Sequence, residues 1–306
     1  MAMVLAAFLA CSFLSTSSQY IYSKEKTCCS IYGETMLQIR ELLIQQERIQ
    51  KSVDSLRQTV QSLEDDETKT HKDIQIVKKC LVDCQDLYMY TTGPKQSGVY
   101  TIYPFGNETR LKVYCNMETE DGGWTAIQRR SSGSVGFKRT WAEYKKGFGN
   151  PAESYWIGND VIHQLTNGRN STLYVYITLK NGTTMYERYH HFSVSGESDN
   201  YRLYLGGPAT GTLGDVILDT GRSSLNLSWM SFSTLDRDHD KWDNNDWLDS
   251  DNCAAIHGRG GGWWYNWCSY ANLNGPWSSS DWYMPWNPPL EYGDDITGTL
   301  MMIKHN

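Results

Sequence analysis

Apolar side chains recur at alternating intervals of three and four residues from Ile39 to Val77, and this pattern constrains the chain more than any other feature. Read as heptads, the two seam positions are occupied by Ile39, Gln46, Val53, Val60, Glu67 and Ile74, and by Leu42, Ile49, Leu56, Leu63, Thr70 and Val77. Gly and Pro are absent between Glu34 and Lys79, so nothing here breaks a helix. The pattern predicts a coiled coil that joins several copies of the chain.

The seam does not fix the number of chains in that coiled coil. Branched residues at the first seam position with Leu at the second favour two strands, but Gln46 and Ile49 blur the preference. A dimer and a trimer therefore both stay open. Glu67 and Thr70 interrupt the seam inside an acidic run, and we expect a weak point there. The alternative reading is an amphipathic helix that packs against its own domain.

The segment before the helix has the character of a targeting signal. An apolar run from Met3 to Leu14 is followed by small residues, which is typical of a secretory signal peptide over residues 1–18. The run is shorter than the roughly 20 residues that span a bilayer, and we expect no membrane span elsewhere. A buried N-terminal helix is the alternative. The chain of 306 residues thus divides into a signal peptide, a coiled-coil region at 19–79 and a globular domain at 80–306.

Cysteine usage and glycosylation sequons also favour an extracellular protein. Eight cysteines are many for a cytosolic chain, and removal of the signal peptide would leave seven, an odd number. Cys28, Cys29 and Cys80 flank the helix, so we expect interchain disulfides among them. Acceptor sequons for N-linked glycans begin at Asn107, Asn170, Asn181 and Asn226.

Beyond residue 80 the pattern changes to that of a globular α+β domain. Short alternating stretches at 111–115, 172–178 and 201–205 predict antiparallel strands, and residues 140–146 and 159–165 predict short helices. Across the chain 40% of residues are apolar, which suffices for a packed core. The net charge of −7 argues against a nucleic-acid partner, because such proteins need a basic face.

An ordered set of motifs in this region resembles the fibrinogen C-terminal domain. The motifs are Asp83-Cys84, Ser97–Pro104, Val113–Thr119, Gly122–Arg130, Tyr155–Asp160, Phe232–Thr234, Gly262–Tyr265 and Ala271–Gly275. The resemblance covers about residues 80–306 and implies a twisted antiparallel sheet with short helices and long loops. It also implies two disulfides, Cys84–Cys115 and Cys253–Cys268. A coiled coil before such a domain is similar to ficolin-like or tachylectin-like lectins, invertebrate fibrinogen-related proteins and angiopoietin-type ligands.

An acidic stretch is the strongest candidate for a metal site. Residues 236–252 carry seven Asp, whose charges repel one another unless a cation relieves them. Hard divalent cations prefer such oxygen ligands, so we expect Ca²⁺; a solvated acidic loop is the alternative. The family resemblance assigns side-chain ligands to Asp238 and Asp240, and backbone carbonyls to Trp242 and Asn244.

A Trp-rich stretch beside the second disulfide suggests a ligand pocket. Nine of the twelve Trp lie between Trp229 and Trp286, and we expect Trp263 and Trp264 to be core. In the lectin members of the family an acetyl group sits in an aromatic pocket next to a cis peptide bond. Carried over by position, that pocket would comprise His257, Trp267, Cys268, Ser269, Trp277 and Tyr292.

The pocket departs from the acetyl-binding pattern at His257 and Ser269, and the stretch from Asp240 to Cys253 is longer than is usual in the family. The ligand could therefore be another glycan, an anion or a protein. No Gly-x-Ser-x-Gly, His-Glu-x-x-His or phosphate-loop motif is present, so we expect no enzyme.

The main functional hypothesis is a secreted, oligomeric, calcium-dependent lectin of innate immunity that binds glycans or acetylated groups on microbial or cell surfaces. In that hypothesis the coiled coil multiplies weak binding of single pockets. The alternatives are an angiopoietin-like ligand of a cell-surface receptor and a structural clotting or matrix protein.

Overall fold

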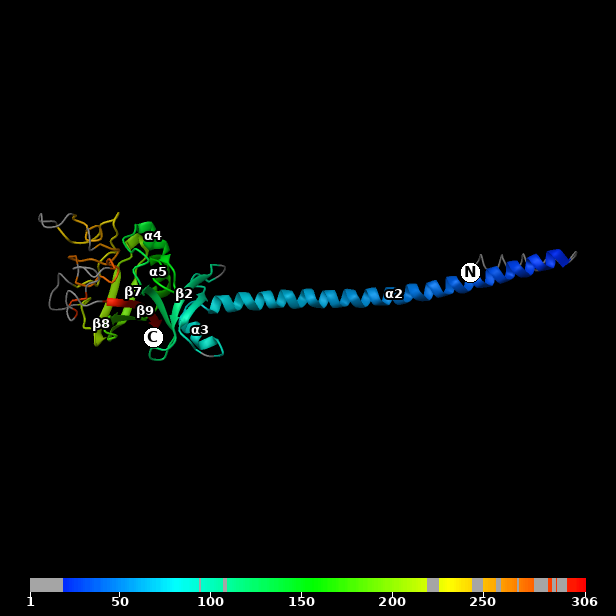
Figure 1. Cartoon of the computed structure of the whole chain (residues 1–306), viewed down its shortest axis with the longest axis horizontal. Helices are drawn as coiled ribbons and strands as arrows, with labels where there is room; N and C mark the ends of the chain where they lie inside the picture. Colours follow the sequence, from blue (N-terminus) through cyan, green and yellow to red (C-terminus); the bar gives the residue numbers. More distant parts are fainter. Residues whose placement is uncertain are drawn as a thin grey trace. The chain divides into compact units, whose positions relative to one another are not determined.

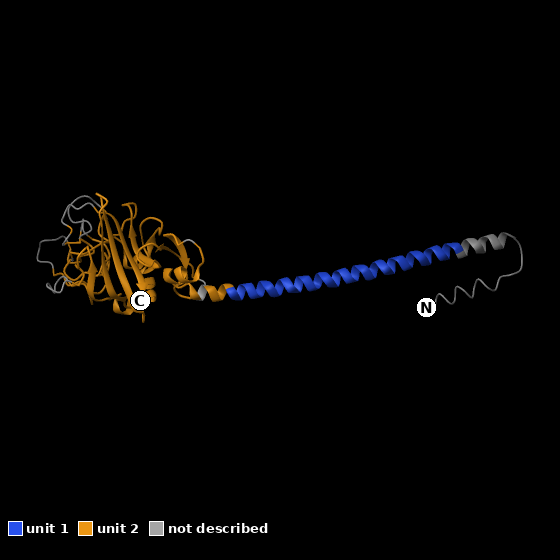
Figure 2. Cartoon of the chain, turned by 90° about the horizontal axis from the view of Figure 1, so that it is seen from below, with its two compact units in different colours: residues 1–73 blue, residues 74–306 orange. Residues whose placement is uncertain are grey.

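The structure, a computed structural model, describes residues 19–93, 95–106, 109–218, 226–243, 250–256, 260–268, 270–277, 286–287, 290 and 296–306, without the side chains of residues 19–29, 78 and 79. The predicted signal peptide at 1–18 lies outside these residues. Figure 2 colours two compact units, residues 1–73 and residues 74–306. The fold is the expected one, a long N-terminal helix and an α+β globe with an antiparallel sheet.

The N-terminal helix α2 runs without interruption from Gln19 to Cys80 (Figure 1). It continues through Glu67 and Thr70, so the interruption of the seam leaves the backbone helical. Most of the apolar seam residues are exposed, among them Leu42, Leu56 and Leu63 at 63%, 65% and 63%. A helix gains most of its stability from packing of its apolar face, and within one chain this face is unpacked.

Three short helices follow, and their sequences explain where two of them begin. Helix α3 (Cys84–Tyr90) starts at Asp83, and α4 (Trp141–Lys146) starts at Thr140. Each of these residues caps its helix in a capping box, with Asp86 and Glu143 as the reciprocal partners. Helix α5 (Asn159–Thr166) buries its apolar side against β7 of the sheet.

All strand pairs of the globe are antiparallel, and the order along the sheet is β1-β2-β3-β9-β6-β7-β8. The main strands are β1 (Gly98–Ile102), β2 (Leu111–Asn116), β3 (Trp124–Arg130), β6 (Ser171–Leu179), β7 (Thr184–Val194), β8 (Leu203–Gly211) and β9 (Ile296–His305). The short strands β4 (Phe148–Gly149) and β5 (Tyr155–Trp156) pair with each other, and β5 also pairs with β3. Thus β9 lies in the middle of the sheet although it comes last in sequence.

A contact between the buried Asp83 and His305 links α3 to β9. The Asp83 carboxylate is 4% exposed and lies 2.7 Å from His305 Nε2. It also accepts hydrogen bonds from the backbone N–H groups of Gln85 and Asp86. Burial opposes the charged form, but these bonds to His305 and the backbone outweigh it and hold the pKa of Asp83 below its usual value.

Aromatic rings fasten the loops after β8 onto the sheet and helices. Trp264 is 1% exposed and packs against Trp156 and Phe232, while its indole N–H donates to the backbone oxygen of Tyr201. Trp263 is buried as well, which confirms that both are core residues. Gly262 lies so close to the ring of Tyr144 that a Cβ at this position would collide with it.

Polar contacts from β3 add to this attachment. Gln128 Nε2 donates to Leu273 O at 2.9 Å, and the buried Arg130 guanidinium donates to Gly275 O. Arg130 has no carboxylate partner among the described residues, and burial lowers its pKa to about 10. The loops are therefore held by side chains of the sheet in addition to their own aromatic packing.

Candidate functional site

The acidic loop brings the two predicted side-chain calcium ligands together. Asp240 donates its backbone N–H to the Asp238 carboxylate at 3.1 Å, so the two residues form one tight turn. The Asp240 carboxylate accepts from the backbone N–H groups of Trp242 and Cys253, each at 2.8 Å. Burial, aided by the charge of Asp238, raises the pKa of Asp240 to about 7. The half-buried Asp240 carboxylate thus lies beside the second disulfide, and the exposed Asp238 carboxylate is its neighbour in the turn.

The donor chemistry of this turn fits a hard cation. Both carboxylates offer oxygens, and a cation would relieve their mutual repulsion. Asn244 lies outside the described residues, so the carbonyl half of the expected site is not seen in full. In the described parts of the chain, no group of three or more His, Cys, Asp or Glu side chains is placed to hold a metal ion. Calcium therefore remains a prediction.

Asp236, which belongs to the same acidic stretch, has a structural role. Its carboxylate accepts from the backbone N–H of Trp141 at 2.8 Å and from the hydroxyl of Thr234 at 2.8 Å. It therefore ties the loop to the first turn of α4. Counting Asp residues in the sequence cannot distinguish this one from Asp238 or Asp240.

Two Trp side chains form a lip next to the disulfide. The rings of Trp242 and Trp267 meet edge to face with centroids 5.7 Å apart, and Trp267 is 50% exposed. The bridge Cys253–Cys268 follows immediately, with Cα atoms 5.0 Å apart. Cys268 has φ of +35°, a conformation that is uncommon outside glycine. The family resemblance assigned only the backbone carbonyl of Trp242 to the calcium site. Its side chain is in addition an aromatic partner of Trp267, which the sequence did not reveal.

The structure brings only part of the predicted pocket into view. His257, Ser269 and Tyr292 lie outside the described residues. Trp277 lies against Gly133, with its ring 5.4 Å from the Arg130 guanidinium. Within the described residues it has no ring pairing with Trp267. The cis peptide bond found in these residues joins Gly207 to Pro208, so the bond between Trp267 and Cys268 lacks the cis form seen in the lectin members.

The first predicted disulfide joins Cys84 at the start of α3 to Cys115 in β2, with Cα atoms 5.6 Å apart. Cys80, at the end of α2, is exposed and forms no disulfide with another described cysteine. Cys28 and Cys29 belong to α2, but their side chains are outside the description. Interchain bridging therefore stays a prediction.

The sequons occupy different environments. Asn181 is exposed in the turn between β6 and β7, and Asn170 is exposed just before β6. The side chain of Asn226 is engaged on both sides, because Nδ2 donates to Leu218 O and Oδ1 accepts from Ser228 N. Asn107 lies outside the described residues.

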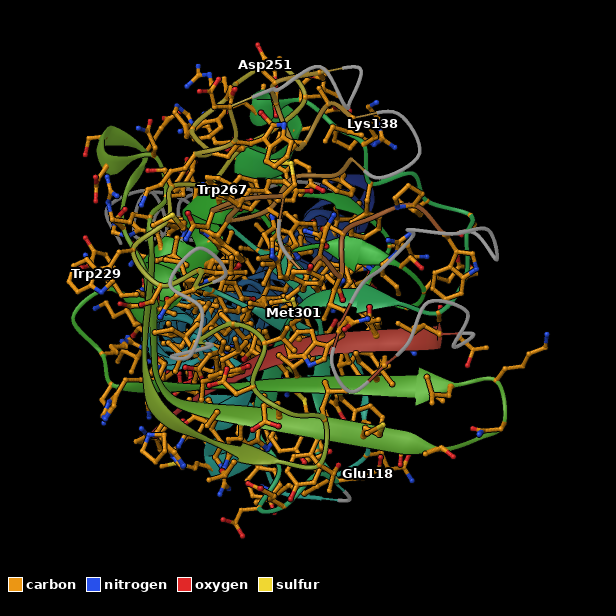
Figure 3. All side chains as sticks on the ribbon, turned by 90° about the vertical axis from the view of Figure 1, so that its left-hand side faces the viewer. Glu118, Lys138, Trp229, Asp251, Trp267 and Met301 are labelled. Carbon is orange, nitrogen blue, oxygen red and sulfur yellow. A yellow bond between two sulfur atoms is a disulfide. The ribbon has the colours of Figure 1, made fainter. Side chains whose placement is uncertain are left out.

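A second exposed aromatic pair was not foreseen. Trp229 is 63% exposed, and its ring meets that of Tyr204 edge to face with centroids 4.7 Å apart. In Figure 3 its side chain is labelled at the edge of the globe, at a different place from Trp267. Nothing in the sequence around Trp229 distinguishes it from the buried Trp263 and Trp264.

Comparisons with known proteins agree on one family. The model of the C-terminal globular domain of fibrinogen beta and gamma chains matches residues 80–287. Angiopoietin-2 of Canis lupus familiaris is 36% identical over 302 residues, which are 94% of this chain and 56% of that protein. The fibrinogen alpha chain of Mus musculus is 40% identical over 213 residues, 67% of this chain and 26% of that protein.

Solved structures agree with these relatives. The fibrinogen-like globe domain of human ANGPTL6 superimposes with a TM-score of 0.63 at 35% identity, over 73% of this chain and 95% of that domain. Lamprey fibrin D-dimer, complexed with the peptide Gly-His-Arg-Pro-amide, gives a TM-score of 0.63 at 27% identity, over 90% of this chain and 94% of that one. The chain spans about half the length of the angiopoietin-2 proteins that it matches.

These comparisons correct the functional prediction. Matches to angiopoietin-2 extend over most of the chain, and the globes of human ANGPTL6 and ANGPTL2 share its fold, so the prediction of a calcium-dependent lectin of innate immunity is wrong. The proteins of the matched family are non-enzymatic. No helix in the described part of the chain is long and apolar enough to cross a membrane.

Proposed function

Because the chain belongs to the family of fibrinogen C-terminal globular domains, we propose that it is a secreted ligand that signals by binding a cell-surface receptor. The observation that carries this proposal is the match to angiopoietin-2 across 94% of the chain, helix and globe together. A match confined to the globe would leave the arrangement open, since the same domain serves many functions. The alternative already raised by the sequence, an angiopoietin-like ligand, thus becomes the main reading.

The helix provides self-association in this proposal. Its exposed seam, which includes Leu42, Leu56 and Leu63, needs an apolar partner, and a second or third copy of the same helix supplies a matching seam. Association places several globes on one assembly. Their combined affinity for receptors clustered on a membrane can then exceed that of one globe by about 10²–10⁴.

The lip formed by Trp242 and Trp267 is the receptor contact that we propose. Trp is enriched among the residues that dominate binding energy at protein interfaces. Trp267 is half exposed yet backed by a second ring and by the disulfide, so little freedom is lost when a partner covers it.

The test displays a library of receptor ectodomains on cells and measures binding of the full chain to each. We expect one ectodomain to bind saturably. Trp267→Ala should weaken that binding roughly tenfold or more, because an interface hot spot contributes about 2 kcal/mol.

Trp229→Ala is the matched control, since it removes an exposed Trp at another place on the globe. Absence of any saturable binding to the library would refute the proposal. Gelation of the protein at rising concentration would instead favour the structural or clotting alternative.

We also propose that Ca²⁺ occupies the turn at Asp238 and Asp240. Cation binding would replace the repulsion between these neighbouring carboxylates by attraction. Calcium should therefore raise the melting temperature of the globe over that in chelator, and Asp238→Asn with Asp240→Asn should abolish the difference. Identical melting curves of the unmodified protein in calcium and in chelator would exclude the site.

A further inference from the structure

A small groove lies where β6 begins and β7 and β8 run beside it. Its volume is about 270 Å³, below the roughly 300–1,000 Å³ of pockets for drug-sized ligands. The lining combines polar side chains, among them Asn170 and His191, with the aromatic residues Phe192, Tyr204 and Trp229. Such a space suits a small amphipathic group, of the size of one sugar ring.

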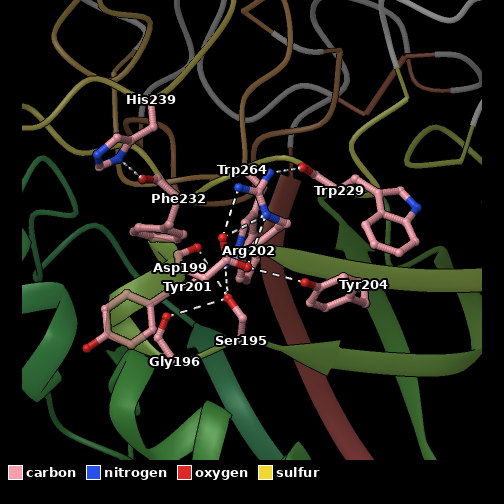
Figure 4. A network of polar contacts seen from close by, with 10 residues as sticks. All are labelled: Ser195, Gly196, Asp199, Tyr201, Arg202, Tyr204, Trp229, Phe232, His239 and Trp264. Atoms are coloured by element: carbon pink, nitrogen blue, oxygen red, sulfur yellow. Dashed lines mark hydrogen bonds and ion pairs between the residues drawn. The ribbon is translucent and has the colours of Figure 1, made fainter.

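The aromatic wall of this groove is held firmly in place. Trp229 has φ of +72°, a strained conformation for a bulky residue. Its backbone N–H donates to Leu203 O at 2.7 Å, and its carbonyl accepts from the Arg202 guanidinium at 2.8 Å. Figure 4 shows this network, in which Asp199 binds both Arg202 and the hydroxyl of Tyr204. The surrounding bonds thus keep an exposed indole in a fixed position.

Tyr204 completes a corner with Trp229. The two rings are nearly perpendicular, at 84°, with centroids 4.7 Å apart. A pyranose ring has an apolar face of C–H groups and an edge of hydroxyls. The indole face can cover the former, while the exposed His191 of the groove can bond the latter.

Asn170 lies in the same groove and begins a glycosylation sequon, Asn170-Ser171-Thr172. The residue is exposed, and its Oδ1 lies 2.9 Å from His191 Nδ1. This contact uses the amide oxygen. The nitrogen, which is the atom that carries a glycan, has no hydrogen bond in the described part of the structure. The side chain is therefore fixed by its oxygen while its point of attachment stays available.

We propose that a glycan attached to Asn170 folds back into this groove and stacks its first N-acetylglucosamine on Trp229 and Tyr204. Attachment forms a bond between C1 of that sugar and Asn170 Nδ2, and breaks the bond from C1 to a lipid-linked diphosphate donor. The lipid diphosphate is the leaving group and the amide gives up a proton. The docked sugar covers an indole that would otherwise be exposed.

Asn181 supplies a matched comparison within the same chain. Its sequon lies in the turn between β6 and β7, where the side-chain oxygen accepts from Thr183 N at 2.8 Å. Asn181 does not line the groove at Trp229. A glycan on Asn181 should therefore stay undocked and open to peptide-N-glycosidase.

The test uses the full chain secreted from animal cells. Site occupancy is measured by mass spectrometry of glycopeptides, and release by peptide-N-glycosidase is followed without denaturation. We expect both sites to be occupied and release at Asn170 to be several-fold slower than at Asn181. Trp229→Gly, which suits the positive φ and keeps the turn, should remove that difference, whereas Trp267→Ala should preserve it.

Oxidation of Trp by N-bromosuccinimide gives an independent measurement. Trp229 should be oxidised several-fold faster in Asn170→Gln than in the glycosylated protein, with Trp267 unchanged as an internal reference. Any one of three results would overturn the inference without touching the proposed function. The first is equal release of glycan from Asn170 and Asn181, and the second is an unoccupied Asn170 beside an occupied Asn181. The third is equal oxidation of Trp229 in Asn170→Gln and in the glycosylated protein. Absence of glycan at both sites would count against secretion, and so against the proposed function as well.

Discussion

Helix α2 and the globe treat the same kind of side chain in opposite ways. Leu56 and Leu63 of the helix leave 65% and 63% of their surface exposed, whereas Leu165 and Leu273 of the globe leave none. The globe buries its apolar residues within one chain, so its stability does not depend on concentration. The helix seam has no apolar partner among the residues that the structure describes, so we expect its stability to rise with the concentration of other copies.

The largest effect is expected when the seam is broken, because self-association should be lost while the globe stays folded. Leu56→Asp with Leu63→Asp should eliminate self-association, because each buried Leu contributes about 1.5–3 kcal/mol per chain and the Asp charges repel. Sedimentation analysis should find single chains, while the thermal transition of the globe stays where it was.

Ser55→Asp with Ser62→Asp is the matched control, since it adds the same charges outside the seam. Association should survive in that variant. An assembly that persists in the Leu variant would mean that contacts other than the seam join the copies.

A cavity in the globe should do the reverse: it should destabilise the globe and leave self-association unchanged. Trp264→Ala removes a ring that is 1% exposed and packs on Trp156 and Phe232, so it should lower the free energy of unfolding by about 3–5 kcal/mol. Denaturant titration of the globe measures the loss, and sedimentation should find association unchanged. Trp229→Ala, at an exposed position, should cost far less. Comparable losses in the two variants would contradict the assignment of Trp264 to the core.

Acidification should weaken the link between α3 and β9. The pKa of Asp83 is lower in the folded protein than in the unfolded chain, so its charge stabilises the fold above about pH 4 and this contribution is lost as pH falls through the folded pKa. Asp83→Asn keeps a good helix cap but removes the charge. We expect it to cost about 1.5–3 kcal/mol at pH 7 and progressively less below pH 4, measured by denaturant titration.

Asp86 provides a control in which stability depends on pH in the opposite direction, because burial and the charge of Asp83 raise the pKa of Asp86. Relative to the unmodified protein, Asp86→Asn should gain stability as pH rises above 4. A pH-independent effect of Asp83→Asn would show that its charge is not the stabilising feature.

Repairing the seam should have the smallest effect. Thr70→Val places an apolar side chain at an interrupted seam position and should stabilise the assembly by about 1 kcal/mol per chain. Thermal melting followed by the helical circular dichroism signal, at several protein concentrations, measures this gain. Thr68→Val lies outside the seam and should give none. Equal gains in both variants would point to helix propensity instead of packing.

Local patterns in the sequence were enough to predict much of the fold. Alternation at 172–178 predicted β6, and the spacing of Thr140 and Glu143 sets the start of α4. The heptads predicted α2 because most seam residues repeat a single local rule. Resemblance to the fibrinogen domain added both disulfides of the globe, whose pairing spacing alone could not determine.

The candidate site was less predictable because it depends on contacts between distant residues. Gln128 binds Leu273 across 145 positions, and the pairing of Trp242 with Trp267 depends on how the disulfide closes its loop. Function was predicted wrongly because lectins and receptor ligands share this fold, so motifs that maintain the fold do not distinguish them. The match to angiopoietin-2 over the helix and globe together supports the proposed receptor ligand, for which the motifs alone gave no preference.

The central place of β9 has a consequence for how the globe is made. In the described part of the sheet, strands β1 to β3 and β6 to β8 form two half-sheets, and β9 joins them. During synthesis these halves leave the ribosome before the strand that unites them, so both must wait with unpaired edges exposed. Nascent chains of this domain therefore expose these edges until Ile296–His305 emerges and is inserted between β3 and β6.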